Sequence, residues 1–410
     1  MNGWGPVRRR IDVDHMGWLE GLPVCAAVQV GDWVFVSGQV SVDDSGVVCD
    51  GGDPRAQAHR AFAGLQATLE AAGASLADVV DVMTFHLDMR DVDVVFDVGR
   101  EYLSGGFPAW TPVGMGGSWA SGIGLVVRAI ACVGDEPKRC FVPDQLAWLR
   151  DLPVSAGCGR GELLFVSTTA TAADGSVLAP GDPEGQATAA HEHVARVVAE
   201  AGGSMDDVID LCSFHQDPRG MVGGEAAHLR TFAGTPLAQA PAWTAIGTPA
   251  LLRLGMLAQY RAIADLSPGG RLAHTPEALH WKHQPISGGT RKTGGRLVGI
   301  AGEVASDGEG TIIGVGDTAA QARYAFDRIA EVMEMHGGSL TDVVEVTSFH
   351  KDARAWEIVL DVARDYFPQG TEPAWTPVGT TGLWNPGYLH EIYALGVLDP
   401  GSSTTSGTYV

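Results

Sequence analysis

The sequence has few basic residues and no long apolar run. Both absences argue against particular binding partners, namely nucleic acids and membranes. Lysine and arginine total 27 against 49 acidic residues, so the formal net charge is −22. A polyanion such as nucleic acid, or an anionic membrane surface, would meet a repulsive field. No apolar stretch approaches the ~18 residues that a membrane-spanning helix needs. We therefore expect neither nucleic acid nor a membrane as a partner.

Cysteine is also sparse, and no two cysteines form a recognisable motif. Six cysteines are spread over 410 residues without a CxxC motif. This spacing favours reduced thiols over a disulfide framework or a zinc ribbon. Arg8, Arg9 and Arg10 are not followed by an apolar stretch, so neither a secretory nor a twin-arginine signal is expected. The predicted location is the cytoplasm.

What the chain does contain is apolar residues, glycine and internal repetition. Apolar residues make up 45% of the sequence, enough for a sizeable core, and the 55 glycines predict many tight turns. Two motifs each occur three times, and their copies lie about 130 residues apart. The motif Pro-Ala-Trp-Thr has its tryptophans at Trp110, Trp243 and Trp375, and Phe-His-x-Asp-x-Arg has its histidines at His86, His215 and His350.

The repeats predict three similar domains. We expect a first domain at residues 1–135, a second at 136–267, a third at 268–400, and a flexible tail at 401–410. Within each unit, β-branched runs alternate with amphipathic helical stretches in the order ββ-α-β-α-β. The expected fold class is therefore α+β, with each sheet carrying two helices on one face.

At this point the chain resembles the RidA/YjgF family of reactive-intermediate deaminases. The resemblance rests on FVSGQV at residues 35–40, the helix that carries Gln57, AAGASLADVVDV, the Pro-Ala-x turn and the closing VVRAIA. It implies a mixed, chorismate-mutase-like sheet in each unit and a trimer with a ligand cleft between neighbours. Three copies in one chain would close a pseudo-trimer by themselves, so we expect a monomer or weak dimer with three non-identical clefts.

The resemblance also implies an activity, the hydrolysis of enamines and imines. No cofactor or metal is expected, because the glycine runs lack the strand-to-helix context of a phosphate loop and the histidines lack the spacing of a zinc motif. The family binds the substrate carboxylate with an arginine in Pro-x-Arg, a position that is tryptophan in all three repeats here. An indole has one donor and no charge, so it does not replace that salt bridge. A typical small carboxylate substrate is therefore not expected, whereas a tryptophan can stack on an aromatic or cationic ligand.

Glu391 is the leading catalytic candidate. The family's water-activating glutamate corresponds to Val126, Gln259 and Glu391, and only the third repeat keeps an acid. Burial on an apolar strand would raise the pKa of this carboxyl and suit it to proton transfer; the alternative is an ion pair at a strand end. Glu303 replaces Gln39 of the first repeat and is a second candidate, because two carboxylates can divide acid and base roles.

The Phe-His-x-Asp-x-Arg motif supplies further candidates for substrate binding. If Phe85 packs under the helices, His86 points into the trimer interior, where three histidines could meet; we predict hydrogen bonding there rather than a metal. Each motif arginine either binds an anion in the cleft or forms a surface pair with the preceding aspartate. The candidate substrate-binding set is Trp110, Thr111, Trp243, Thr244, Trp375, Thr376, Arg90, Arg219, Arg354, His86, His215 and His350.

The sequence favours two functions, and a third, a structural role as a protein-interaction ring, stays open although the three Pro-Ala-Trp-Thr motifs argue for pockets. One is an enzyme of small-molecule, specialised metabolism that acts on an imine, enamine or enol in an interdomain cleft. The other is a protein that binds or senses a flat small molecule in tryptophan-lined clefts without converting it. Ligand stoichiometry separates them, because one working cleft takes one molecule and three equivalent clefts take three.

Overall fold

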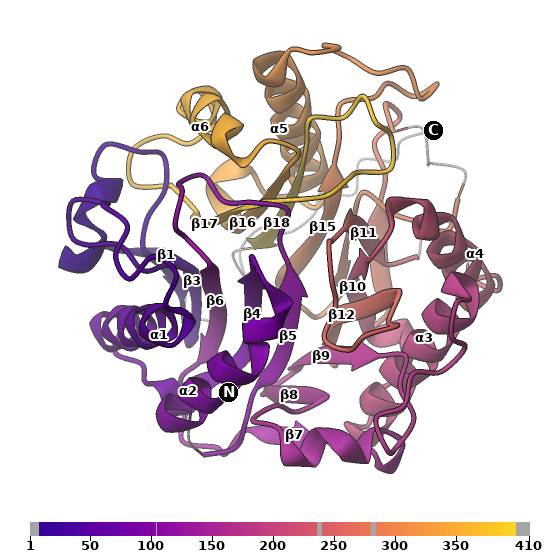
Figure 1. The fold of residues 1–410 in the computed structure, drawn as a ribbon. Coiled ribbons are helices and arrows are strands. Elements are labelled where there is room, and N and C mark those ends of the chain that lie inside the picture. Colours follow the sequence, from indigo (N-terminus) through magenta and orange to yellow (C-terminus); the bar gives the residue numbers. More distant parts are fainter. Residues whose placement is uncertain (1–7, 104, 236–239, 280–283, 399–410) are drawn as a thin grey trace.

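The three repeats form three sheets arranged around a common centre, with the helices on the outside (Figure 1). The computed structural model describes residues 8–103, 105–235, 240–279 and 284–398. The tail expected at 401–410 lies outside these residues. No helix in the described part of the chain is long and apolar enough to cross a bilayer. The single-chain pseudo-trimer of α+β domains is thus confirmed.

Each sheet has six strands in the same spatial order, which for the first repeat is β1-β2-β3-β6-β4-β5. The first sheet contains β1 (Arg8–Ile11), β2 (Ala27–Val30), β3 (Trp33–Gln39), β4 (Val79–His86), β5 (Ala109–Gly114) and β6 (Leu125–Cys132). The second contains β7 (Arg139–Phe141), β8 (Gly157–Arg160), β9 (Leu163–Thr169), β10 (Val208–His215), β11 (Ala242–Gly247) and β12 (Ala258–Asp265). The third contains β13 (Arg271–His274), β14 (Gly289–Lys292), β15 (Leu297–Glu303), β16 (Val343–His350), β17 (Ala374–Gly379) and β18 (His390–Val397).

Each repeat places two helices on the outer face of its sheet. A capping aspartate starts the long helix, as Asp53 does by accepting a bond from the Ala56 amide, and a glycine such as Gly73 (φ +78°) follows its end. A capping box formed by Ser75 and Asp78 starts the short helical turn that follows. The helices are α1 (Pro54–Ala71), α2 (Val92–Tyr102), α3 (Pro183–Glu200), α4 (Met221–Thr231), α5 (Thr318–Met335) and α6 (Trp356–Ala363).

The Pro-Ala-Trp-Thr motif is a strand and not the turn that the resemblance suggested. Ala109 to Gly114 form β5, which pairs in parallel with β4, and the same holds for β11 and β17. Proline lacks an amide donor and is therefore tolerated just before such an edge strand. The tryptophan two residues later consequently projects from a sheet.

The inner and outer faces of the central strands are the reverse of the arrangement considered from the sequence. Phe85, Phe214 and Phe349 meet at the centre, where Phe349 lies 6.3 Å from each of the other two rings. Strand alternation then turns the neighbouring histidines outward beneath the helices. His215 shows this directly, because a Cβ on Gly224 of α4 would lie 2.5 Å from its Cε1. The motif histidines do not converge at the centre.

A buried ion network joins the three repeats near the centre. Arg128 of β6 binds Asp81 of its own repeat and Glu345 of the third repeat. Arg261 of β12 donates to Asp81 at 2.8 Å, and all these side chains are buried. Each arginine therefore bonds an acid from another repeat, which fixes how the repeats are docked.

The third repeat has a tyrosine in place of the arginine at this network. Tyr393 donates to Asp210 Oδ2 at 2.9 Å, and Asp210 Oδ1 has no hydrogen-bond partner. Burial raises the pKa of Asp210 to about 6. The network has three acids and two guanidiniums. Asp210 accepts the neutral hydrogen bond of Tyr393 and lies 3.6 Å from Arg261, which also binds Asp81.

Candidate active site

Glu391 lies in a cleft between the second and third repeats. It projects from β18 and is 5% exposed. The cleft is a cavity of about 170 Å³. Its lining comes from both repeats and includes Glu225, Trp243, Ala245, Ile286, Gly302, Trp384, Tyr388 and Glu391. The tryptophan that faces Glu391, which the sequence left undecided, is Trp243.

The surroundings of Glu391 favour its neutral form. Burial, with a smaller contribution from the charge of Glu303, raises the pKa of Glu391 well above its usual value, while the Ala245 amide of the facing repeat opposes that shift. A Cβ at Gly302 would lie 2.1 Å from Glu391 Oε1, so only glycine leaves room for the carboxyl. Gly302 in turn donates its amide to Thr244 Oγ1 at 2.8 Å. Thr244 thus joins the two walls of the cleft.

Glu303 is close in sequence to this site but occupies the other face of the sheet. Its strand partner is Ile392, which packs with the α5 side chains, whereas Glu391 faces the cleft. Glu303 is fully buried and neither carboxylate oxygen has a hydrogen-bond partner. Burial raises its pKa well above the usual value, opposed by Arg328. The structure therefore does not bring the two candidate carboxylates into one site.

Each of the three motif tryptophans donates the same type of hydrogen bond to a hydroxyl group of its own repeat, but the three side chains differ in solvent exposure. Trp110 Nε1 donates to Thr84 Oγ1 at 2.9 Å, and that hydroxyl also lies 2.9 Å from His86 Nε2. The same group recurs as Trp243, Ser213 and His215 in the second repeat and Trp375, Ser348 and His350 in the third. Trp110 and Trp375 are 2% exposed and packed in the core, whereas Trp243 is 8% exposed and lines the cavity.

His228 explains why Trp243 differs. Its ring stacks on Trp243 with centroids 4.6 Å apart and planes 8° apart, and its Nε2 lies 3.0 Å from the Pro285 carbonyl oxygen. The corresponding residue of the first repeat is Gly99, where a Cβ would lie 2.5 Å from the Trp110 ring. Trp110 therefore fills the space over its helix, while Trp243 is held off by an imidazole. Burial lowers the pKa of His228 to about 4, so it is neutral.

Glu225 is the second feature that opens this cleft. Counting from the motif histidines, its position is Phe96 in the first repeat and Leu360 in the third, both buried apolar residues. Only the second repeat places a carboxyl there, at the edge of the cavity. Glu225, His228, Trp384 and Tyr388 were missed from the sequence. The available signal was that Glu225 and His228 each break the agreement between the repeats.

A Glu225→Leu variant is expected to fill the mouth of the cleft with the side chain that the third repeat has there. Binding of a small aromatic cation, followed through Trp243 fluorescence, should weaken by roughly tenfold or more, because an apolar group replaces a charge beside the ligand. A Glu357→Leu variant, on the exposed side of α6, is the control and should bind normally. Equal binding by both variants would show that the ligand does not enter past Glu225.

The other two clefts lack the acid. In the first repeat this position is Val126, which lies close to Gly38 of the same repeat and to Thr376 of the third repeat. Gln259 replaces the acid in the second repeat, and its buried amide has no hydrogen-bond partner. Thr111 and Thr376 Oγ1 are likewise buried without partners, in contrast to Thr244. Among the described residues, the full combination of acid, open tryptophan and cavity therefore occurs once.

The motif arginines do not reach any cleft described here. In each repeat the guanidinium Nε donates at 2.9 Å to the aspartate two residues earlier, and both side chains are largely solvent-exposed. These are surface ion pairs of small energetic value. The arrangement corresponds to the surface-pair alternative and leaves the tryptophan-lined cleft without a guanidinium. The residues concerned are Arg90, Arg219 and Arg354.

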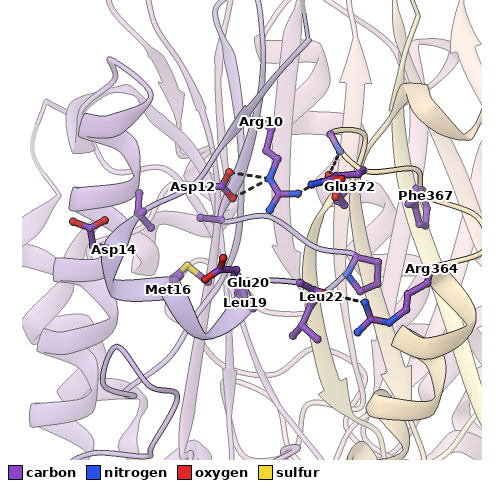
Figure 2. A pocket seen from close by; sticks show the side chains of 17 residues that line it. Arg10, Asp12, Asp14, Met16, Leu19, Glu20, Leu22, Arg364, Phe367 and Glu372 are labelled. Atoms are coloured by element: carbon purple, nitrogen blue, oxygen red, sulfur yellow. Dashed lines mark hydrogen bonds and ion pairs between the residues drawn. The ribbon is translucent and has the colours of Figure 1, made fainter.

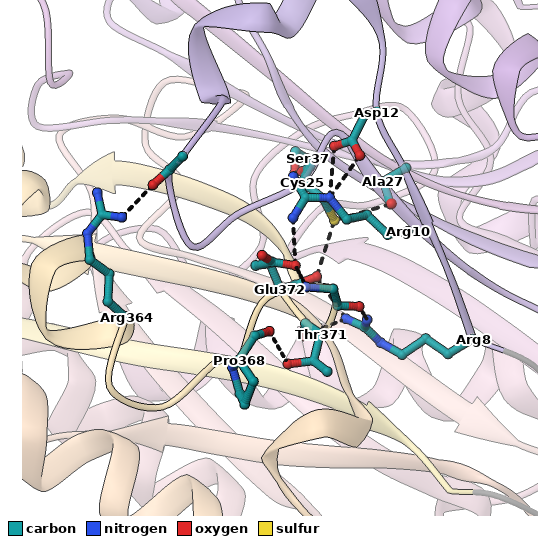
Figure 3. Close-up of polar contacts among 12 residues, drawn as sticks. Arg8, Arg10, Asp12, Cys25, Ala27, Ser37, Arg364, Pro368, Thr371 and Glu372 are labelled. Carbon is teal, nitrogen blue, oxygen red and sulfur yellow. Dashed lines mark hydrogen bonds and ion pairs between the residues drawn. The ribbon is translucent and has the colours of Figure 1, made fainter.

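A larger cavity, about 910 Å³, lies elsewhere, between the opening segment of the first repeat and the third repeat (Figure 2). Four of its charged residues, Arg10, Asp12, Arg364 and Glu372, are already partnered, while Asp14 and Glu20 are exposed to solvent. Arg10 bridges Asp12 at 2.9 Å and Glu372 at 2.6 Å. Arg364 donates to the Gly21 carbonyl, and Arg8 to the backbone of the Glu372 loop (Figure 3). These contacts tie two repeats together and leave no free buried acid or base for chemistry.

Comparison with known proteins identifies the family of each repeat. The sequence pattern described as endoribonuclease L-PSP matches residues 23–131, 153–265 and 287–398. The chain belongs to the endoribonuclease L-PSP family. Its three matches cover one repeat each, which confirms the resemblance to RidA/YjgF proteins in every repeat.

Relatives of this L-PSP family chain correspond to single repeats. The RutC family protein YjgH of Escherichia coli K12 is 35% identical over 113 residues, which are 27% of this chain and 83% of that protein. The 2-iminobutanoate/2-iminopropanoate deaminase of Dermatophagoides farinae is 37% identical over 93 residues, 23% of this chain and 73% of that protein. A crystal structure of a chorismatase covers 78% of this chain and 93% of its own at a TM-score of 0.52 and 14% identity, a likeness of fold alone.

Proposed function

We propose that this L-PSP family chain hydrolyses a cationic or neutral imine, or its enamine tautomer, that carries no carboxylate. The observation that carries the proposal is the single cleft in which a buried carboxyl faces an aromatic wall. The described residues that line it include Glu225 and Glu391 but no lysine or arginine. A protonated imine is attracted to the carboxylate of Glu225 and to the indole faces, whereas a substrate carboxylate would meet no cation among these residues and would be repelled by Glu225.

The proposed step uses Glu391 as the base. Its carboxylate accepts a proton from water while the water oxygen bonds to the imine carbon, and the electron pair of the C=N bond moves to nitrogen. The protonated Glu391 then returns the proton to the nitrogen. The Glu391 carboxylate next takes the hydroxyl proton of the resulting carbinolamine and passes it to the nitrogen, so that the C–N bond breaks as the C=O bond forms. Imine and water thus become a carbonyl compound and an amine or ammonia. The name of the mite relative, an imine deaminase, supports this reaction class.

The other lining residues would orient the substrate. Trp243 is held by Ser213 and His228 and offers a fixed face for stacking. Tyr388 and Trp384 also line the cavity. Since Trp110 and Trp375 are packed in the core, we expect one substrate per chain and not three.

The substrate class is tested with imines generated in situ. An amine oxidase supplies imines without a carboxylate, and an amino-acid oxidase supplies 2-imino acids. Release of the carbonyl product should be accelerated over the spontaneous rate for the first set and much less for the second. Faster hydrolysis of 2-imino acids would contradict the charge argument. No acceleration of either set, together with tight binding of aromatic cations, would favour the alternative of a non-catalytic binding protein.

A further inference from the structure

Two cysteines that are distant in sequence lie side by side in the second repeat. Cys140 of β7 and Cys158 of β8 are direct partners in an antiparallel pair, and their sulfur atoms are 3.1 Å apart. A disulfide requires about 2.05 Å between sulfurs, so roughly 1 Å of closure is enough. The corresponding pairs are Arg10 with Val28 and Ala273 with Thr290. The dithiol is thus specific to the second repeat.

The two thiols differ in access. Cys140 is exposed and Cys158 is fully buried beneath it. An oxidant in solution can therefore reach one sulfur, and the second sulfur is already placed behind it. We propose that Cys140 and Cys158 form a thiol oxidation site that reacts with a hydroperoxide to give a reversible cross-strand disulfide.

The local electrostatics support Cys140 as the sulfur that reacts first. A hydrogen bond joins the two sulfurs, and this bond, aided by the nearby ammonium of Lys138, lowers the pKa of Cys140 to about 7. The same bond, together with burial, raises the pKa of Cys158. The thiolate is the nucleophilic form of cysteine, and here it is placed on the exposed sulfur.

The reaction balances with the peroxide as the oxidant. The Cys140 thiolate attacks one peroxide oxygen, the O–O bond breaks, and an alcohol or water leaves with a sulfenic acid left on Cys140. Cys158 then attacks the Cys140 sulfur, and its proton departs with the hydroxide as water. Two electrons pass from the two thiols to the peroxide. A dithiol reductant reverses the reaction by thiol–disulfide exchange.

The remaining cysteines serve as internal controls. The sulfurs of Cys25 and Cys132 have backbone carbonyls as their hydrogen-bond partners, and burial raises the pKa of each to about 12. Cys212 is buried, and its pKa is raised further. Cys49 is partly exposed without a neighbouring thiol. None of them has a sulfur partner among the described residues.

The test treats the full-length protein with hydrogen peroxide and maps its peptides without reduction. We expect a loss of two hydrogens in mass and a Cys140–Cys158 crosslinked peptide that dithiothreitol removes. Cys158→Ser should instead leave a sulfenic acid on Cys140 that dimedone traps, and Cys140→Ser should give neither product. Cys49→Ser should behave like the parent protein. A Cys140 that stays reduced while Cys49 is oxidised, or a dimedone adduct with no crosslink in the parent, would overturn the proposal.

Discussion

Glu391→Gln is expected to lower kcat for imine hydrolysis by roughly 100- to 10,000-fold, the range that a positioned acid–base group contributes. Glutamine keeps the size of the side chain but neither accepts nor returns the proton. The measurement is steady-state product release, with the far-ultraviolet circular dichroism spectrum as the check on folding. Because KM reports mainly the aromatic walls, it should change far less than kcat.

Glu303→Gln is the matched control for that variant. Glu303 is just as buried and lies on the neighbouring strand, but it faces the helices and not the cleft. Its replacement should leave most of the activity. An equal loss of kcat in both variants would mean that the two carboxyl groups maintain the folded structure, and it would contradict the catalytic role proposed for Glu391. Full activity in Glu391→Gln would contradict it directly.

Stability should respond to pH in the opposite sense to activity. The raised pKa of Glu391 means that the folded state holds a proton that the unfolded chain releases near pH ~4.3. The free energy of unfolding therefore falls as pH rises from that value toward the folded pKa. Turnover, which needs the carboxylate, should rise over the same interval. Denaturant titrations at several pH values should show a smaller stability slope in Glu391→Gln than in the parent.

Arg128→Met is expected to be the most destabilising single change, with a loss of about 3–5 kcal/mol in the free energy of unfolding. The substitution removes a fully buried guanidinium and leaves Asp81 and Glu345, from two different repeats, without their shared partner. Urea unfolding followed by tryptophan fluorescence measures the loss. The docking of the first repeat on the third should weaken first.

Arg219→Met is the matched control, since it also removes an arginine bound to an aspartate. That pair is exposed to solvent, so the change in unfolding free energy should stay within about 0.5 kcal/mol. A similar small effect of Arg128→Met would contradict a role for the central network in holding the repeats together.

Much of the architecture was predictable because it is encoded locally and three times over. The helix caps at Asp53 and Ser75, the glycine after the helix and the alternating strands follow from short-range rules. The Pro-Ala-Trp-Thr strand was mistaken for a turn, since proline and a short motif look alike in both. The direction of Phe85 was also undecided, because alternation says which residues share a face and not which face is inside.

The sequence by itself determined that this chain is three copies of one α+β unit, and that one copy has an acid, Glu391, where the resemblance implies a catalytic one. Only the tertiary structure decided that Trp243 faces Glu391, that Glu303 does not, and that the motif arginines point to solvent. The physical reason is that repetition and periodicity report only on residues that are near one another along the chain. A cleft is built from strands of two repeats, and its chemistry depends on which side chains meet across their interface.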